Sequence, residues 1–113
     1  MNTLEPTEVT GLQYEITRTY IATCFSATRL QSAISRNRIP ECRAYEEKFR
    51  RNFVYLFHLI SVAPSIDPDV KALYKYWESL STYGRRMKYF KYTLFVFEEV
   101  KKEITDRGIV KLG

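Results

Sequence analysis

The chain has 113 residues, of which 45% are hydrophobic and 27% charged, a composition that predicts a single folded domain over 1–113 and excludes a disordered tail. Four Gly and four Pro provide too few turn residues for a protein built from many strands. The formal net charge is +5, which favours phosphate groups or acidic protein surfaces as partners.

The cysteines and the uncharged segments predict the compartment. Cys24 and Cys42 fall on different predicted helices, about 18 Å apart along the helix axes, which is beyond the reach of a disulfide. The longest uncharged run, 52–66, is too short to span the hydrocarbon core of a bilayer, and the first residues lack the pattern of a secretion signal. We therefore expect two free thiols, a cytoplasmic protein and no membrane partner.

The first predicted helix covers 7–37. Apolar residues recur every three or four positions from Val9 to Ile34, which is the spacing of one buried helical stripe. The stripe fades over 36–40, and Pro40 disfavours helix at the residue before it. We therefore place the first turn close to Ile39.

The second predicted helix covers 41–63, with Pro40 at its start and Glu41 favourable to the helix dipole. Its second half, 53–60, is apolar on nearly every side. Such a segment is buried from several directions, either in the centre of the protein or in a contact between subunits.

Two further helices are predicted over 68–83 and 85–107. Asp67 followed by Pro68 is a strong helix start, and Gly108 is a favourable residue just past a helix end. The segment 92–97 in the last helix is again apolar nearly all round. Four helices joined by short connections predict an all-α fold, an antiparallel four-helix bundle of up-down-up-down order.

Two groups of basic residues flank the first and third predicted turns, which share one end of an up-down-up-down bundle. Residues 29–51 and 85–91 together hold 11 Lys and Arg against three Glu, so we expect a basic pole that binds phosphate. The other interpretation is solvated charge at helix ends, which accounts for Arg36 and Arg38 near a helix C-terminus but not for Arg85 and Arg86 near an N-terminus. The basic pole is predicted to comprise Arg36, Arg38, Arg43, Arg85, Arg86, Lys88 and Lys91.

Aromatic residues make up 15% of the chain, which is high for so small a core. One interpretation places the surplus rings on the surface, where they stack on nucleic-acid bases or bury themselves in a homo-oligomer. The residues expected to do so are Tyr55, Tyr83, Tyr89, Tyr92 and Phe95. The other interpretation is one large core shared by Phe53, Phe57, Trp77, Phe90 and Phe97.

The single histidine has two interpretations. Arg51-Asn52 followed by His58 resembles the motif of the HEPN ribonuclease superfamily, in which an Arg is followed by a polar residue and then a His. That superfamily is all-helical and of similar size, and its Arg and His serve RNA cleavage at a dimer interface, so the resemblance implies a ribonuclease site at Arg51 and His58. Because His58 lies within an apolar run, a histidine buried in the core is the other interpretation.

The sequence therefore predicts a non-enzymatic helical bundle whose basic pole binds nucleic acid or another polyanion. The alternatives are a protein-interaction module (an adaptor, inhibitor or immunity-type bundle) acting through aromatic helix faces, and a HEPN-like ribonuclease. One His and two distant Cys make no zinc site, so neither a metal nor another cofactor is expected.

Overall fold

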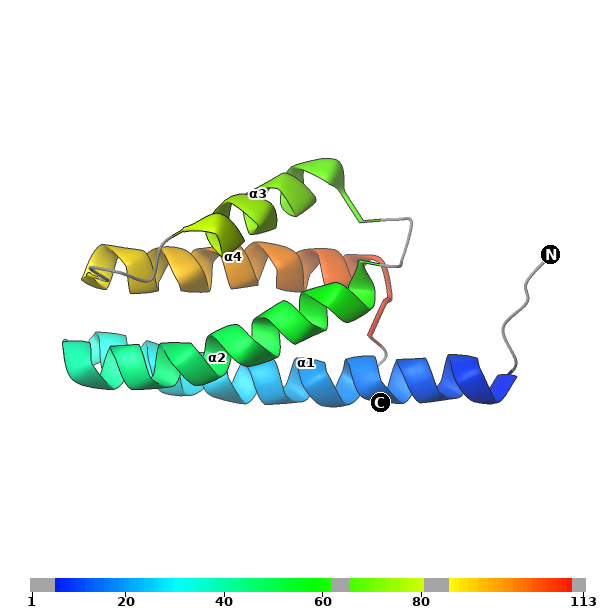
Figure 1. Cartoon of the computed structure of the whole chain (residues 1–113), viewed down its shortest axis with the longest axis horizontal. Coiled ribbons are helices and arrows are strands. Elements are labelled where there is room, and N and C mark those ends of the chain that lie inside the picture. The colour runs from blue at the N-terminus through cyan, green and yellow to red at the C-terminus, as the bar shows by residue number, and fades with distance from the viewer. Residues whose placement is uncertain (1–5, 62–65, 81–85, 111–113) are drawn as a thin grey trace.

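A computed structural model describes residues 6–61, 66–80 and 86–110, with side chains from Gly11 onward. These residues form four helices and no strand, which confirms the prediction of an all-helical chain with four helices. The helices are α1 (Pro6–Ser35), α2 (Ile39–Ile60), α3 (Pro68–Ser79) and α4 (Met87–Asp106). Figure 1 shows α1 and α2 along one side of the molecule, with α4 beside them and the short α3 lying obliquely over α4. None of the four is at once long and apolar enough to cross a membrane.

Asn37, not Pro40, decides where α1 ends. Asn37 adopts the left-handed conformation, with a φ of 53°, and the amide of Arg38 donates to the carbonyl of Ala33 at 3.2 Å. This arrangement satisfies a terminal carbonyl of the helix and stops it. The predicted break before Pro40 was therefore misplaced by two residues: Ile39 already belongs to α2, and Pro40 lies in its first turn, where its missing N–H costs nothing.

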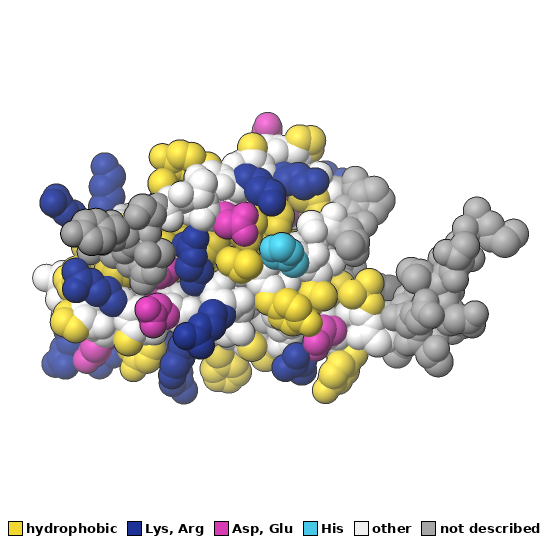
Figure 2. Space-filling view, in the orientation of Figure 1, with side chains coloured by type: hydrophobic (Ala, Val, Ile, Leu, Met, Phe, Trp, Pro, Cys, Tyr) yellow, Lys and Arg dark blue, Asp and Glu magenta, His cyan; other side chains and the backbone are white. Residues whose placement is uncertain are grey.

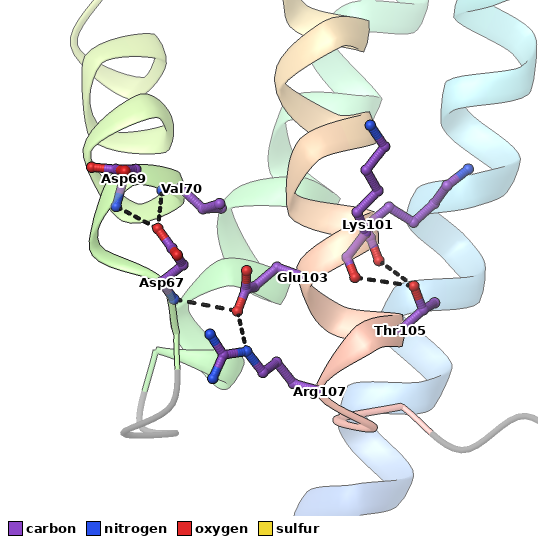
Figure 3. A network of polar contacts seen from close by, with 8 residues as sticks. Asp67, Asp69, Val70, Lys101, Glu103, Thr105 and Arg107 are labelled. Atoms are coloured by element: carbon purple, nitrogen blue, oxygen red, sulfur yellow. Dashed lines mark hydrogen bonds and ion pairs between the residues drawn. The ribbon is translucent and has the colours of Figure 1, made fainter.

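The predicted start of α3 is confirmed. The carboxylate of Asp67 accepts hydrogen bonds from the amides of Asp69 and Val70, at 2.7 and 3.4 Å, and Pro68 is the first helical residue (Figure 3). Helix α3 ends at Ser79, before the predicted 83, and residues 81–85 lie outside the described part of the chain. The prediction that Gly108 follows the end of α4 is also confirmed, because Gly108 has a φ of 64°, in the left-handed region that glycine adopts without strain.

The start of α3 is held to the end of α4 by one carboxylate. Glu103 accepts a hydrogen bond from the amide of Asp67 at 3.3 Å and pairs with Nε of Arg107 at 2.8 Å (Figure 3). At the same end of α4 the hydroxyl of Thr105 donates to the carbonyls of Lys101 and Lys102. The hydrogen bond between Asp67 and Glu103 therefore joins α3 to α4 at the end of the molecule that lies away from the α1–α2 turn, and the other contacts stabilise the last turn of α4 (Figure 1).

The core is predominantly aromatic. The ring centroid of Phe53 lies 4.9 Å from that of Trp77, 5.3 Å from that of Phe97 and 5.4 Å from that of Tyr74. Side chains of α2, α3 and α4 therefore meet around one phenylalanine. The five residues predicted to form a large core are all buried: Phe53, Phe57, Trp77, Phe90 and Phe97.

A polar layer links the same three helices. The guanidinium of Arg50 lies 4.5 Å from the ring centroid of Trp77 and donates to the Glu78 carbonyl at 2.7 Å and to the Tyr89 hydroxyl at 2.9 Å. The indole N–H of Trp77 in turn donates to Oγ1 of Thr93 at 2.9 Å. Arg50 is therefore a structural residue that satisfies the last turn of α3 rather than a surface charge.

The two cysteines are free, as predicted. Cys42 is buried between α1, α2 and α4, whereas Cys24 is half-buried on α1. Burial raises the pKa of both thiols. Both are therefore protonated at neutral pH, the state in which a thiol reacts least.

Tyr74 makes the fold sensitive to alkaline pH. Its ring stacks on Phe57 with the centroids 3.7 Å apart, and burial, together with the nearby carboxylate of Glu78, raises the pKa of its hydroxyl well above its ordinary value. The pKa of Tyr74 is therefore higher in the folded chain than in the unfolded one. The contribution of its neutral hydroxyl to the free energy of unfolding is fully present below about pH 10 and is lost as the pH rises towards the folded pKa. We therefore expect Tyr74→Phe to gain stability relative to the wild type as the pH rises above about 10.

Circular dichroism during urea unfolding at a series of pH values measures that gain. Tyr76→Phe is the matched control, because Tyr76 lies two residues further along the same helix and is 59% exposed. The alkaline gain should be larger for Tyr74→Phe than for this control. An equal gain in the two variants, or no gain for Tyr74→Phe, contradicts the assignment of the alkaline sensitivity to Tyr74.

Candidate functional site

The α1–α2 turn and the start of α4 lie at the same end of the molecule (Figure 1). A small apolar cluster holds them together, in which Ala33 and Ile34 of α1, Cys42 of α2 and Phe90 of α4 are buried against one another. The two basic groups, which are far apart in the sequence, are thereby brought to one end. Figure 2 shows Lys and Arg side chains, in dark blue, gathered at that end on the left.

Acidic residues neutralise part of the basic pole. Glu41 pairs with Arg36 at 3.3 Å and with Arg38 at 3.1 Å, so one carboxylate offsets much of the charge at the α1–α2 turn. Arg85 lies outside the described residues. Within the described ranges, four residues of the basic pole are exposed and form no ion pair, so they carry its unneutralised charge: Arg43, Arg86, Lys88 and Lys91.

Exposed rings lie beside these cations on α4. Lys88, Lys91 and Phe95 follow one another at helical spacing on the outer face of α4, where Phe95 is 51% exposed. The ring of Tyr92 lies between those of Tyr76 and Phe95, with centroid distances of 6.2 and 6.1 Å. Cationic side chains and aromatic rings therefore alternate over the first half of α4, where Tyr92 is half-buried and Phe95 exposed, whereas Tyr83 lies outside the described residues.

A cavity of about 440 Å³ opens between the end of α3 and the start of α4. Tyr76 of α3 is a wall of this cavity that the sequence analysis missed. The buried stripe of α3 runs through Leu73 and Trp77, so the residue directly before Trp77 must face outward, and this spacing was the available signal. The cavity is lined by Tyr76, Leu80, Arg86, Lys88, Tyr89 and Tyr92.

Tyr89 differs from the other predicted stacking residues. It is half-buried, and its hydroxyl accepts from Arg50 at 2.9 Å and donates to the buried carboxylate of Glu46 at 3.3 Å. These bonds fix the ring orientation at the cavity wall. Tyr89 therefore shapes the cavity from within the polar layer.

Two helices begin at the basic pole without a side-chain cap. The N-cap residues are Arg38 for α2 and Arg86 for α4, and neither side chain accepts a hydrogen bond from the first turn that follows it. The first turn of α4 also contains no acidic residue. Because helix N-termini carry partial positive charge, both helix starts add to the positive potential produced by the Lys and Arg side chains.

His58 is exposed, so the prediction of a core histidine was wrong. Its neighbours Leu56 and Phe57 are buried, but the helix turns both Tyr55 and His58 outward. Figure 2 shows the histidine, in cyan, on the surface of the face in view. Arg51 and His58 line one cavity of about 670 Å³, and its other walls are Glu47, Arg50, Val54 and Tyr55.

Tyr55, predicted as an interface residue, is 44% exposed but already has a partner within the chain. Its hydroxyl donates to Oε2 of Glu15 at 2.9 Å, and Arg18 pairs with Oε1 of Glu15 at 2.7 Å. The hydrogen bond from Arg18, followed by that from Tyr55, lowers the pKa of Glu15. Tyr55 therefore serves first to tie α2 to α1.

The fold and the site together define a small all-helical protein with a basic, aromatic-lined end. Within the described residues no group of three or more His, Cys, Asp or Glu side chains is placed to hold a metal ion. No family model matches the sequence, and no curated protein and no solved structure matches it either.

Proposed function

We propose that this chain is a non-enzymatic, antiparallel four-helix bundle that acts as a homo-oligomer and binds nucleic acid or another polyanion at its basic pole. The observation that carries the proposal is the meeting of the α1–α2 turn with the start of α4 over the cluster that contains Ala33, Cys42 and Phe90. That packing gathers four exposed cations with no ion-pair partner among the described residues onto one end.

The mechanism is phosphate neutralisation with little reading of base identity. Arg43 and Arg86 offer forked donors to phosphate oxygens, and Lys88 and Lys91 add mobile point charges. The starts of α2 and α4 contribute their partial positive charge at the same end. The exposed rings of Tyr76 and Phe95, with the half-buried ring of Tyr92 between them, provide flat surfaces on which unpaired bases of any sequence can stack.

Two free thiols support a reducing compartment, and we propose the cytoplasm as the place of action. Nucleic acid is abundant there, and a weak, sequence-tolerant binder meets it continually. The proposed function needs neither a metal nor a cofactor.

Fluorescence polarisation of labelled single-stranded and double-stranded DNA and RNA tests the proposal. We expect binding at about 50 mM salt that weakens tenfold or more by about 200 mM, because each phosphate contact releases counterions from the nucleic acid. Adding inorganic polyphosphate as competitor separates phosphate binding from base stacking. Absence of binding at the lower salt concentration rules out nucleic acid as the partner.

The second candidate is a protein-interaction module, and the exposed aromatic faces favour it. Six large hydrophobic side chains are exposed among the described residues, including Tyr55 and Phe95 of the predicted interface set. For this function, substituting Phe95 by Ser should abolish partner binding, whereas charge reversal at Lys88 and Lys91 should affect mainly the association rate.

The third candidate, a HEPN-like ribonuclease, rests on the shared cavity of Arg51 and His58. It predicts cleavage of single-stranded RNA by the wild-type chain and none by His58→Ala. Since His58 is exposed, the variant should keep the stability of the wild type within about 0.5 kcal/mol. RNA that stays intact with the wild-type chain, or that both proteins cleave equally, eliminates this candidate.

A further inference from the structure

Helix α1 carries a second stripe of large side chains on the face opposite the core. Tyr14 and Phe25 are 68% and 67% exposed, and Ile21 lies between them at 45%. Their spacing of seven and then four residues keeps them on one face of the helix. Figure 2 shows hydrophobic and basic side chains alternating along the lower edge of the molecule, where Figure 1 places α1.

Two arginines complete the stripe. Arg18 and Arg29 are exposed and fall on the same face, so the order along the helix is Tyr14, Arg18, Ile21, Phe25, Arg29. Arg18 is held in place by its pair with Glu15, whereas Arg29 forms no ion pair within the described part of the chain.

We infer that this stripe binds the same stripe of a second copy of the chain, with the two α1 helices antiparallel. In an antiparallel pair related by a twofold axis beside Ile21, residue numbers that face each other add up to a constant. With that constant at 43, Tyr14 faces Arg29 of the other copy, Arg18 faces Phe25, and Ile21 faces Ala22.

This register pairs each exposed ring with a guanidinium. Arginine over the face of an aromatic ring is a favourable contact, and a twofold axis provides each such contact twice. A parallel register instead places Arg18 against Arg18 and Arg29 against Arg29. The pairing of arginines with exposed rings therefore favours a second copy of the chain as the partner of this stripe, with the two α1 helices antiparallel.

The interface is small. Five side chains along about four turns of one helix bury less than the roughly 800 Å² per partner of a standard interface. We therefore expect a dimer that dissociates in the micromolar range. The inference rests on the homo-oligomer of the proposed function and specifies its contact. It is separate from the nucleic-acid binding, because the basic pole begins where α1 ends and the stripe lies along the middle of that helix.

Sedimentation velocity of the full chain between about 1 and 500 µM tests the inference. The wild type should shift from monomer to dimer over this range, and Ile21→Lys, which places two cations beside the axis, should remain monomeric throughout. Phe95→Lys is the matched control, with an exposed apolar residue of α4 changed to the same cation, and should dimerise as the wild type does.

A mixing experiment tests the register. The homodimer of Tyr14→Lys places the introduced lysine against Arg29 of the other copy, and does so twice. The homodimer of Arg29→Glu loses both contacts between Arg29 and the ring of Tyr14. Each variant alone should dimerise at least tenfold more weakly than the wild type. Their equimolar mixture should recover dimer, because one Lys–Glu pair and one Arg–Tyr contact form.

Three results overturn the inference. The first is a wild-type chain that stays monomeric up to the highest concentration, and the second is a dimer that Phe95→Lys disrupts and Ile21→Lys does not. The third is a mixture that remains as monomeric as its two components. Nucleic-acid binding by a strictly monomeric protein would rule out the dimer, and with it the homo-oligomer of the proposed function, while leaving the binding function of the basic pole intact.

Discussion

The double substitution Lys88→Glu/Lys91→Glu is expected to weaken nucleic-acid binding by roughly a hundredfold at about 100 mM salt. Both side chains are exposed and form no ion pair among the described residues, so each is free to contact a phosphate. Reversal removes two attractive contacts and adds two repulsive ones next to Arg86. The slope of log affinity against log salt should fall by about two, since each lost phosphate contact removes about one.

A charge-matched control separates the basic pole from the total charge. Lys71→Glu/Lys102→Glu changes the net charge by the same amount, but these residues lie at the start of α3 and in the second half of α4, away from the pole. Lys102 is exposed and pairs with Glu99 at the surface, so its loss costs little stability. The control should weaken binding by less than about threefold. Equal losses for the two double variants would show that net charge, not the basic pole, governs binding.

The helices were predictable from the sequence because their apolar spacing and their end residues agree. Asp67 and Gly108 start and end their helices through hydrogen bonds and backbone conformations that depend only on residues adjacent in the sequence. Asn37 acts in the same way, but Pro40 is the more familiar signal, and it was given too much weight. When a left-handed residue has already ended one helix, the next helix can begin at the residue directly before a proline, because a proline in the first turn costs no hydrogen bond.

The basic pole was predictable in outline, whereas its electrostatics were not. The turns can be recognised in the sequence, and in an up-down-up-down order of helices the first and third turns lie at the same end. The location of the pole follows from that order. The pairing of Arg36 with Glu41 spans the turn and depends on the backbone conformation of Asn37, so no helical spacing rule predicts it. Arg50 and Arg51 are neighbours in sequence, yet one is stacked on Trp77 and the other is exposed. Only tertiary packing distinguishes them.

The same limitation explains His58 and the stripe on α1. A continuous apolar run does not show which face of its helix is buried, because amphipathic side chains such as Tyr and His can lie either in the core or on the surface. In α1 a regular core stripe through Ile16, Tyr20 and Leu30 accounted for the pattern so well that Tyr14 and Phe25 on the opposite face went unnoticed. A second stripe becomes visible only when the first is known to be buried.

The inferred dimer and the basic pole together define a bivalent particle. The pole begins about 20 Å along α1 from the proposed twofold axis, at roughly 1.5 Å per residue. An antiparallel α1 pair therefore directs its two poles towards opposite ends. Two weak sites on one particle gain affinity for a long strand that reaches both, but gain nothing for a short oligonucleotide.

Phe53→Ala is expected to lower the free energy of unfolding by about 3–5 kcal/mol. Phe53 is fully buried, and its ring contacts those of Phe49, Tyr74, Trp77 and Phe97, so truncation leaves a cavity where α2, α3 and α4 meet. A domain of this size is typically stable by about 5–15 kcal/mol, so the variant should be folded but close to its unfolding transition. Urea unfolding followed by circular dichroism and by tryptophan fluorescence measures the change.

Phe95→Ala is the control, because it removes the same ring from a position that is 51% exposed. It should cost less than about 0.5 kcal/mol, at low and at high protein concentration alike. A large cost that appears only at high concentration would show that a second copy covers Phe95, and would move the dimer contact from α1 to α4. A large cost at every concentration would mean that Phe95 belongs to the core of the monomer, which contradicts the packing of α4 described above.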